Sequence, residues 1–151
     1  MYNNIYAKVT AINSSTRFTL DKTIGTLSSK KIYKVTGIAF GNQSHIEGEY
    51  TIASGIDSHA EGSSTAASGK CSHAEGYNTI ASNFQSHAEG SWTIASGNNS
   101  HAEGDGTTAS GYDSHAEGAA TAASGSGSHA EGSSTTASGN SSHAEGTGTI
   151  A

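Results

Sequence analysis

The sequence predicts an all-β fold: a narrow parallel β-roll (β-solenoid) of 14-residue coils with two short strands each, preceded by a small β-rich segment. Two observations support this prediction. Ser-His-Ala-Glu-Gly recurs eight times at intervals of 14 residues, from Ser44 to Gly146, with Ile46 in place of Ala in the first copy. Between the copies, a second small-residue pattern, Thr-x-Ala-Ser-Gly, keeps the same interval from Thr51 onward. A fixed period of this kind is typical of solenoid proteins.

Residues 1–42 are expected to form a small β-rich connector or cap. Runs rich in β-branched and aromatic residues predict its strands. These expected strands are Ile5–Ile12, Arg17–Leu20 and Lys31–Val35. Asn13–Thr16 is a predicted turn, Asp21–Lys30 a loop, and Gly37–Phe40 leads into the repeats. The segment serves either as a cap over the open end of the repeats, which solenoids need, or as a binding module of its own.

Residues 43–151 form the repeat array, in which each 14-residue unit is predicted to be one coil of strand, turn, strand and turn. Gly recurs about every seven residues, which would weaken a helix by about 1 kcal/mol each. The small-residue patterns alternate with the period of two that strands require. Gly followed by two variable residues is typical of a turn. Stacked coils would pair about 4.8 Å apart, so nearly eight coils make a rod of roughly 35–40 Å.

Alternation assigns the two faces of each strand. Ser, Ala and Gly of the first pattern, and Thr, Ala and Gly of the second, should point inward, because so narrow a coil holds only small side chains. The inward hydroxyls would then need partners in neighbouring coils or in the turns. The predicted inward threonines are Thr51, Thr65, Thr79, Thr93, Thr107, Thr121, Thr135 and Thr149. His and Glu point outward.

Charge and composition exclude several classes of partner. The net charge is −6, and twelve of the thirteen acidic residues follow position 42, whereas six of the seven basic residues precede it. An acidic array lacks the Lys and Arg that bind phosphates, so no nucleic-acid partner is expected.

Cys71 is the only cysteine, which leaves no intrachain disulfide. No apolar run approaches the roughly 20 residues of a membrane span, and we expect no signal peptide at Met1. Because the sequence ends within a repeat, we expect it to be part of a longer protein.

The doubled [Ser/Thr]-x-Ala-x-Gly unit over residues 41–151 resembles the head repeats of trimeric autotransporter adhesins, the YadA-like head. This resemblance implies left-handed parallel β-rolls that associate as trimers. The array departs from the adhesin heads in carrying His and Glu where those heads typically carry Val and Ile. Ser-His-Ala-Glu-Gly arrays are also similar to those of tail fibres and tail spikes from phages and prophages of Gram-positive bacteria. There the repeats form a trimeric shaft.

A homotrimer is also expected on physical grounds, because so thin a roll has no substantial core and one outer face should pack on partner chains. The His/Glu face is one candidate, favoured by its uniformity. The other is the second strand, favoured by hydrophobicity. We favour the His/Glu face, provided that each His bonds a Glu, since unpaired buried charge is costly. The variable outward residues of the second strand are Ile52, Ala66, Ile80, Ile94, Thr108, Ala122, Thr136 and Ile150.

The histidines should stack at coil spacing, each beside a glutamate on the same strand face. The histidines are His45, His59, His73, His87, His101, His115, His129 and His143. The glutamates are Glu47, Glu61, Glu75, Glu89, Glu103, Glu117, Glu131 and Glu145. The principal interpretation is a structural hydrogen-bond ladder. The alternative is metal or anion binding on a trimer axis, since both side chains are metal-ligand types. Eight identical copies do not resemble a catalytic constellation, so we expect neither enzymatic activity nor a cofactor.

Large side chains lie at the predicted turns. They are Tyr50, Tyr77, Phe84, Trp92 and Tyr112. They either contact a cell-surface glycan or protein receptor, or fill grooves between protomers.

The sequence is compatible with two classes of function. The first is a structural shaft or receptor-binding fibre segment for host-cell attachment, in a virion tail or phage-tail-like particle. The alternative is the head of a trimeric adhesin on the bacterial cell surface, which binds host matrix or cells. The sequence names no receptor.

Overall fold

The computed structural model describes residues 9–14, 17–20 and 37–151, and the chain divides into two compact units, Met1–Lys34 and Val35–Ala151. In the first unit, strand β1 (Val9–Ser14) pairs antiparallel with β2 (Arg17–Leu20). The bounds of β2 agree with the prediction.

Strand β1 differs from its predicted range at the carboxyl end. The predicted turn began at Asn13, but β1 continues through Asn13 to Ser14, because Ser14 pairs with Arg17 of β2. The start of the predicted strand (5–8), the end of the predicted turn (15–16), the predicted loop (21–30) and the predicted third strand (31–35) lie outside the described residues.

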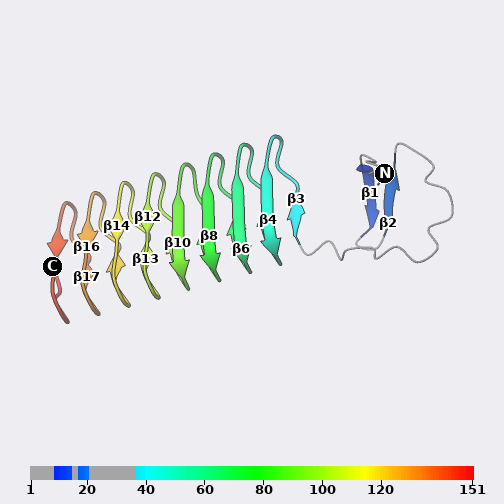
Figure 1. Ribbon diagram of the computed structural model, residues 1–151. Helices are drawn as coiled ribbons and strands as arrows, with labels where there is room; N and C mark the ends of the chain where they lie inside the picture. Colours follow the sequence, from blue (N-terminus) through cyan, green and yellow to red (C-terminus); the bar gives the residue numbers. More distant parts are fainter. Residues whose placement is uncertain (1–8, 15–16, 21–36) are drawn as a thin grey trace, which may run out of the picture. The chain divides into compact units, whose positions relative to one another are not determined.

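In the second unit, each coil contributes one strand to each of two parallel eight-stranded sheets (Figure 1). The first sheet contains β4 (His45–Glu49), β6 (His59–Ser63), β8 (His73–Tyr77), β10 (His87–Ser91), β12 (His101–Ala102), β14 (His115–Ala116), β16 (His129–Ala130) and β18 (His143–Ala144). The second sheet contains β3 (Ile38–Ala39), β5 (Ile52–Ala53), β7 (Ala66–Ala67), β9 (Ile80–Ala81), β11 (Ile94–Ala95), β13 (Thr108–Ala109), β15 (Ala122–Ala123) and β17 (Thr136–Ala137). Successive coils therefore lie side by side, as predicted.

The second sheet begins before the first Ser-His copy. Ile38 of β3 pairs with Ile52 of β5, so the segment expected only to lead into the array already forms a strand. The sequence pattern did not predict this strand, because Gly37 and Phe40 occupy the positions where later coils carry Thr and Ser.

Each strand pairs in register with its equivalent one period further along the chain, as His73 does with His87. The strands of the second sheet are shorter than the five residues predicted. The backbone N–H groups of Ser54 and Gly55 both donate to the Ala67 carbonyl, at 2.9 and 3.3 Å. The chain therefore leaves ladder geometry directly after the buried Ala, and each strand of this sheet is two residues long.

The core between the two sheets consists of small side chains, as the alternation predicted. Each coil places two alanines at 0% exposure, from Ala53 and Ala60 to Ala137 and Ala144. Buried Thr and Ser flank them, and Thr is the largest side chain that is fully buried. The Ser hydroxyl of the first pattern closes a turn by donating to a carbonyl three residues earlier, as Ser58 Oγ does to Gly55 O at 2.7 Å.

The expectation that the inward threonines find partners holds only in part. Thr135 Oγ1 donates to Glu131 O at 3.1 Å, and Thr149 Oγ1 donates to Glu145 O at 2.7 Å. Among the described residues, the other buried Thr hydroxyls have no hydrogen-bond partner. These hydroxyls belong to Thr51, Thr65, Thr79, Thr93, Thr107 and Thr121.

Coil stacking explains the glycine that follows each Glu from Gly48 to Gly132. A Cβ added to Gly62, whose φ is +105°, would lie 2.1 Å from the Gly76 carbonyl oxygen of the next coil. Asn83 is an exception in the second pattern. Its side chain accepts a hydrogen bond from Phe84 N and donates one to Ser96 O, at 3.1 and 3.0 Å. No helix within the described residues is long and apolar enough to cross a membrane.

Candidate functional site

The outward side chains of the first sheet form the His/Glu row. His and Glu flank the buried Ala of the Ser-His-Ala-Glu-Gly strand, so both point away from the core. The row comprises His45, Glu47, His59, Glu61, His73, Glu75, His87, Glu89, His101, Glu103, His115, Glu117, His129, Glu131, His143 and Glu145. Neighbouring imidazoles stack with centroids 4.7–4.9 Å apart and interplanar angles of 1–7°, so the predicted stack at coil spacing is present.

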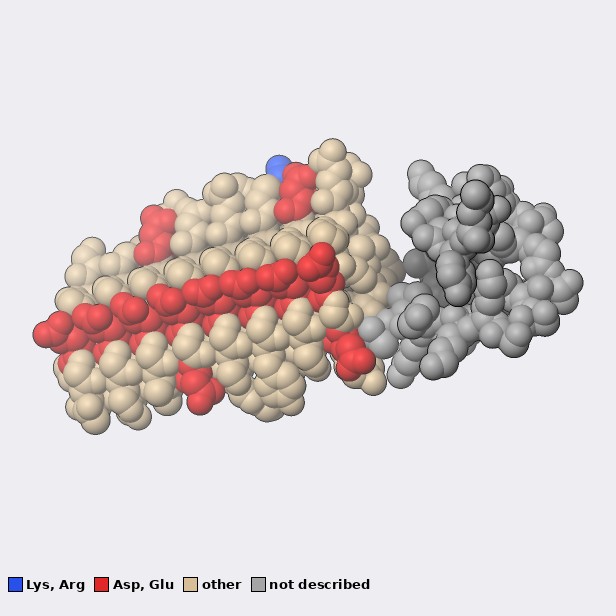
Figure 2. Space-filling view, in the orientation of Figure 1, with Lys and Arg blue, Asp and Glu red and all other residues tan. Residues whose placement is uncertain are grey.

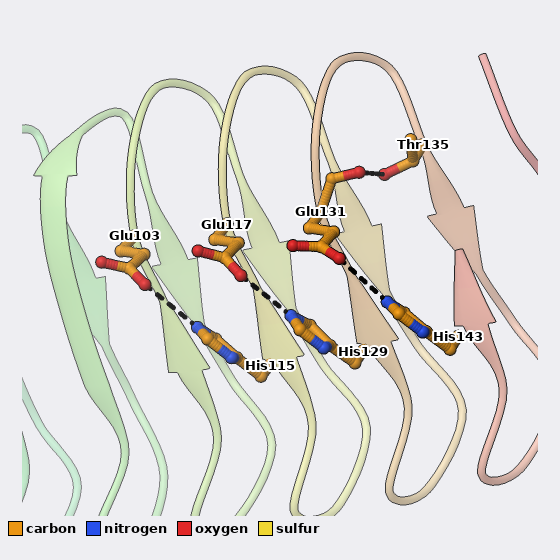
Figure 3. Close-up of polar contacts among 7 residues, drawn as sticks. All are labelled: Glu103, His115, Glu117, His129, Glu131, Thr135 and His143. Atoms are coloured by element: carbon orange, nitrogen blue, oxygen red, sulfur yellow. Dashed lines mark hydrogen bonds and ion pairs between the residues drawn. The ribbon is translucent and has the colours of Figure 1, made fainter. Parts of the chain in front are cut away.

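In the later coils, the histidine bonds the glutamate of the preceding coil rather than the glutamate of its own strand. The distance from Nε2 to Oε1 is 3.2 Å for His115 and Glu103, and 3.0 Å for His129 and Glu117 (Figure 3). His143 and Glu131 repeat the contact at 3.1 Å. The row is therefore a diagonal ladder that links each coil to the next.

The same ladder is looser in the earlier coils. His87 Nε2 lies 3.8 Å from Glu75 Oε1 and 4.0 Å from Glu89 Oε2, which are ion-pair rather than hydrogen-bond distances. The Nε2 atoms of four histidines are shielded from solvent and have no hydrogen-bond partner among the described residues. They are His59, His73, His87 and His101. Each of these imidazoles thus faces carboxylates without contacting either closely.

The carboxylates concentrate negative charge in a continuous band along the array (Figure 2). Their spacing changes how readily they ionise. Hydrogen bonding to Glu89 and to Glu61, together with partial burial, raises the pKa of the Glu75 carboxyl to about 7. The hydrogen bond from Glu75 in turn lowers the pKa of Glu89. With this raised pKa, the Glu75 carboxyl keeps its proton up to near neutral pH.

Two imidazoles of the row have a lowered pKa, which favours their neutral form. Burial is the main cause that lowers the pKa of His73 and of His87, and the neighbouring imidazoles lower it further. At the far end of the row, the hydrogen bond from His143 lowers the pKa of Glu131. A shallow open groove follows the glutamate side of the earlier coils. Its lining is Glu47, Glu61 and Glu75, the glycine after each, and Gly90.

The five aromatic side chains predicted at the turns are all exposed, between 41% for Phe84 and 58% for Trp92. Tyr77, however, is the last residue of strand β8 and not a turn residue, because it pairs with Ser63 and Ser91 of the neighbouring strands. Tyr77 and Trp92, from neighbouring coils, meet edge to face with ring centroids 5.9 Å apart. Trp92 adopts a φ of +57°, in the left-handed region that bulky residues rarely enter. This pair forms an exposed aromatic corner at the end of the first sheet.

A second exposed cluster lies at the other turn and was only partly anticipated. Ile56, Phe84 and Tyr112 are all exposed and occupy the same turn position in alternate coils. Phe84 and Tyr112 were predicted at this turn, but Ile56 was not. The sequence spacing could have identified Ile56, because the three residues are separated by two full periods.

The outer face of the second sheet is also exposed. Its apolar side chains concentrate in the earlier coils, where Ile38, Ile52, Ile80 and Ile94 are 37–43% exposed. Thr108 and Ala122 take the equivalent positions in later coils. The apolar character of this face therefore varies along the array and returns at Ile150, whereas the His/Glu row keeps the same residues throughout.

Three segments of the array, residues 88–114, 102–128 and 130–151, match the family model of the YadA head domain repeat (two copies). No curated protein matches the chain. The later coils thus carry YadA head domain repeats, which confirms the resemblance inferred from the sequence. Such repeats indicate a structural role of the adhesin or fibre type in an extracellular or surface fibre. YadA head domains are typically trimeric.

Proposed function

We propose, from the YadA head domain repeats of the array, that the protein is a homotrimeric, non-catalytic shaft in the tail fibre of a phage, prophage or phage-tail-like particle. It spaces the particle from its target and contributes to host-cell attachment. The observation behind this proposal is the unbroken stack of equivalent coils in two parallel sheets. A stack of this kind supplies length and stiffness rather than an enclosed pocket.

The Ser-His-Ala-Glu-Gly motif supports a tail-fibre shaft rather than an adhesin head. Its outward residues are His and Glu in every coil from Ser44 onward. An adhesin head would carry its typical apolar residues on this face. The head of a trimeric surface adhesin remains the alternative, and the binding experiment below separates the two.

Three chains would pack through the first sheet. A shared axis along the whole rod needs a face that is the same in every coil, which the His/Glu row supplies and the second sheet does not. Within one chain the row is only about two-thirds covered, since the His87 and Glu89 side chains are 36% and 32% exposed. Partner chains would cover the remainder.

The exposed aromatic corner supplies the candidate receptor contact. Tyr77 and Trp92 present ring faces and edges outside the core, and aromatic rings stack well on apolar surfaces of sugars and proteins. Trp92 occupies a strained backbone position where Ser64 and Gly106 stand in other coils. A bulky residue retained in such a position is consistent with a binding role.

Light scattering on a sizing column tests the assembly. The expected mass is three times the chain mass of 15.1 kDa. A folded monomer would overturn the trimeric shaft.

Attachment is tested separately, by binding of the fluorescently labelled protein to Gram-positive bacterial cells and to immobilised collagen. We expect binding to cells, reduced at least tenfold in Tyr77→Ser/Trp92→Ser, because Ser63 and Ser64 show that serine fits both positions. Tyr112→Asn, at the other turn, is the matched control and should bind normally. Binding to collagen but not to bacterial cells would favour the adhesin head. Equal loss in the control would remove the aromatic corner as the receptor contact.

A further inference from the structure

The His87 imidazole lies between carboxylates of two neighbouring coils. His87 Nε2 is 3.8 Å from Glu75 Oε1 in the preceding coil and 4.0 Å from Glu89 Oε2 on its own strand. The other oxygen of Glu89 is 3.6 Å from His101 Nε2. Glu89 therefore faces two imidazoles, and Glu75 likewise faces those of His73 and His87.

The donor atoms match the preferences of a divalent transition-metal ion. Zn²⁺ binds imidazole nitrogen at about 2.0–2.1 Å and carboxylate oxygen at about 2.0–2.2 Å. Two ligands of one tetrahedral ion are then about 3.3–3.5 Å apart. Glu61, His73 and Glu75 each offer one ligand atom within 4.8 Å of the others. Small side-chain rotations would bring these atoms to ligand distance.

Ring geometry limits which histidines share an ion. His87 and His101 stack with centroids 4.7 Å apart and planes 4° from parallel. The lone pair of each Nε2 lies in its ring plane, so two such lone pairs run parallel and do not converge on one point. An ion would thus take one imidazole and two carboxylates, as in Glu61, His73 and Glu75.

The surroundings of the row also favour a cation. In residues 37–151 the only Lys or Arg is Lys70, which lies at a turn and not on a strand of the first sheet. The carboxylates repeat at coil spacing, about 4.8 Å, where they repel one another. The Nε2 atoms of His59, His73, His87 and His101 are shielded and have no hydrogen-bond partner among the described residues. A divalent cation would neutralise the carboxylates and engage these nitrogens at once.

We propose that the His/Glu row is a linear set of binding sites for divalent transition-metal ions such as Zn²⁺, each held by one imidazole Nε2 and the carboxylates of two neighbouring coils. Neighbouring sites share a carboxylate, so ions fill about every second coil. Bound ions cross-link successive coils and stiffen the rod. The contacts belong to a single chain, so this inference does not rest on the trimer or on the tail-fibre function.

Equilibrium dialysis of the whole chain against Zn²⁺, followed by metal analysis, tests the proposal. We expect retention of several Zn²⁺ ions per chain in the presence of a large excess of Mg²⁺, which prefers oxygen ligands. Glu75→Gln/Glu89→Gln should reduce the retained Zn²⁺ by at least one ion per chain. Glu49→Gln, an exposed glutamate outside the row, is the matched control and should retain as much as the unaltered chain.

A second measurement keeps the test decisive if the double variant folds poorly. Co²⁺ added to the unaltered chain should give visible absorption of the intensity typical of tetrahedral coordination, and Zn²⁺ should displace it. The proposal is overturned if no Zn²⁺ is retained, or if Mg²⁺ displaces it. Equal loss in Glu49→Gln would overturn it too.

Discussion

Nε2 of His129 lies 3.0 Å from Oε1 of Glu117, although the two residues belong to neighbouring coils and are 12 positions apart. The contact joins coils that are otherwise held by backbone hydrogen bonds and small buried side chains. Its energetic weight depends on what covers it. An exposed pair is worth less than about 1 kcal/mol, whereas removal of one partner from a buried pair costs about 3–5 kcal/mol.

Glu117→Ala should therefore report which face is buried in the assembly. With the first sheet on the trimer axis, we expect the variant to lower Tm by more than about 5 °C. Thr108→Ala on the outer face of the second sheet is the control, because Ala122 occupies the equivalent position. It should stay within about 2 °C of the unaltered chain. The reverse order in differential scanning calorimetry would place the second sheet on the axis.

Ala67→Val should destabilise the array, because Ala67 is fully buried between the sheets. Extra methyl groups in a filled core cost about 1–3 kcal/mol. Its neighbour Ala66 supplies the matched control, since it points outward and Ile52 and Ile80 occupy equivalent positions. Ala66→Val should change the free energy of unfolding by less than about 0.5 kcal/mol. Similar losses in both variants, measured by chemical denaturation, would contradict the assigned faces.

Thr93→Val and Thr135→Val should have opposite effects. The Thr93 hydroxyl is buried without a hydrogen-bond partner, so its replacement by a methyl group should stabilise the protein by about 1 kcal/mol. The Thr135 hydroxyl donates to Glu131 O, and its loss should cost about 1 kcal/mol. Urea titrations of the two variants measure the difference. Equal destabilisation would mean that the Thr93 hydroxyl is hydrogen-bonded in solution.

Gly62→Ala should disrupt the stack of coils, because its Cβ would lie 2.1 Å from Gly76 O at a φ of +105°. We expect a loss above about 4 kcal/mol. Gly106 offers the control, since a Cβ there would have no neighbour closer than 4.0 Å. Ala120 already fills the equivalent position with a φ of +54°. Gly106→Ala should cost about 1 kcal/mol or less. Circular dichroism melts that show two equally mild variants would refute the close stacking.

Glu75→Gln should alter the pH dependence of stability. The folded pKa of about 7 exceeds the unfolded value of 4.5, so the native state holds the extra proton between these values. Stability therefore falls as pH rises through this window. Gln cannot ionise, so the variant should escape this fall and melt about 1–2 °C above the unaltered chain at pH 8.

The two proteins should differ least near pH 5, where Glu75 is protonated. Melts are compared in the presence of a chelator, which removes metal ions from the row. The lowered pKa values of His73 and His87 add a second trend, because stability is lost as pH falls below 6.5 through those values. This trend is expected in both proteins. Parallel Tm curves between pH 5 and pH 8 would show that the Glu75 carboxyl is not perturbed.

The fold of the array was largely predictable, because one repeating sequence pattern determines both which strands pair and which side chains point inward. A period of 14 residues sets the coil, and alternation within it buries Ala53 and exposes His59. The first strand of the array, β3 (Ile38–Ala39), was missed because Gly37 and Phe40 break the small-residue pattern. The backbone pairing with β5 nevertheless continues. A sequence pattern reports only the side chains, whereas the hydrogen bonds between parallel strands involve only backbone groups.

The site was predictable in its composition but not in its contacts. The histidines and glutamates were assigned to one outward face, and they lie there. The partner of His129 is Glu117 of the preceding coil, because the inclination of the side chains along the strand decides between two neighbours. Sequence spacing cannot give that inclination. The pairing of Tyr77 with Trp92 was missed for a related reason, since it joins the last residue of one strand to a turn residue of the next coil.

The register of the coils has a consequence for the gene. Each strand pairs with its equivalent one period away, so His73 meets His87 through the same contacts that His87 makes with His101. Removal or duplication of one whole period would join surfaces that already fit. Unequal recombination between the repeated codons can therefore shorten or lengthen the rod in steps of one coil without creating a new interface. The length of the repeat array is thus a trait that mutation can adjust independently of its fold.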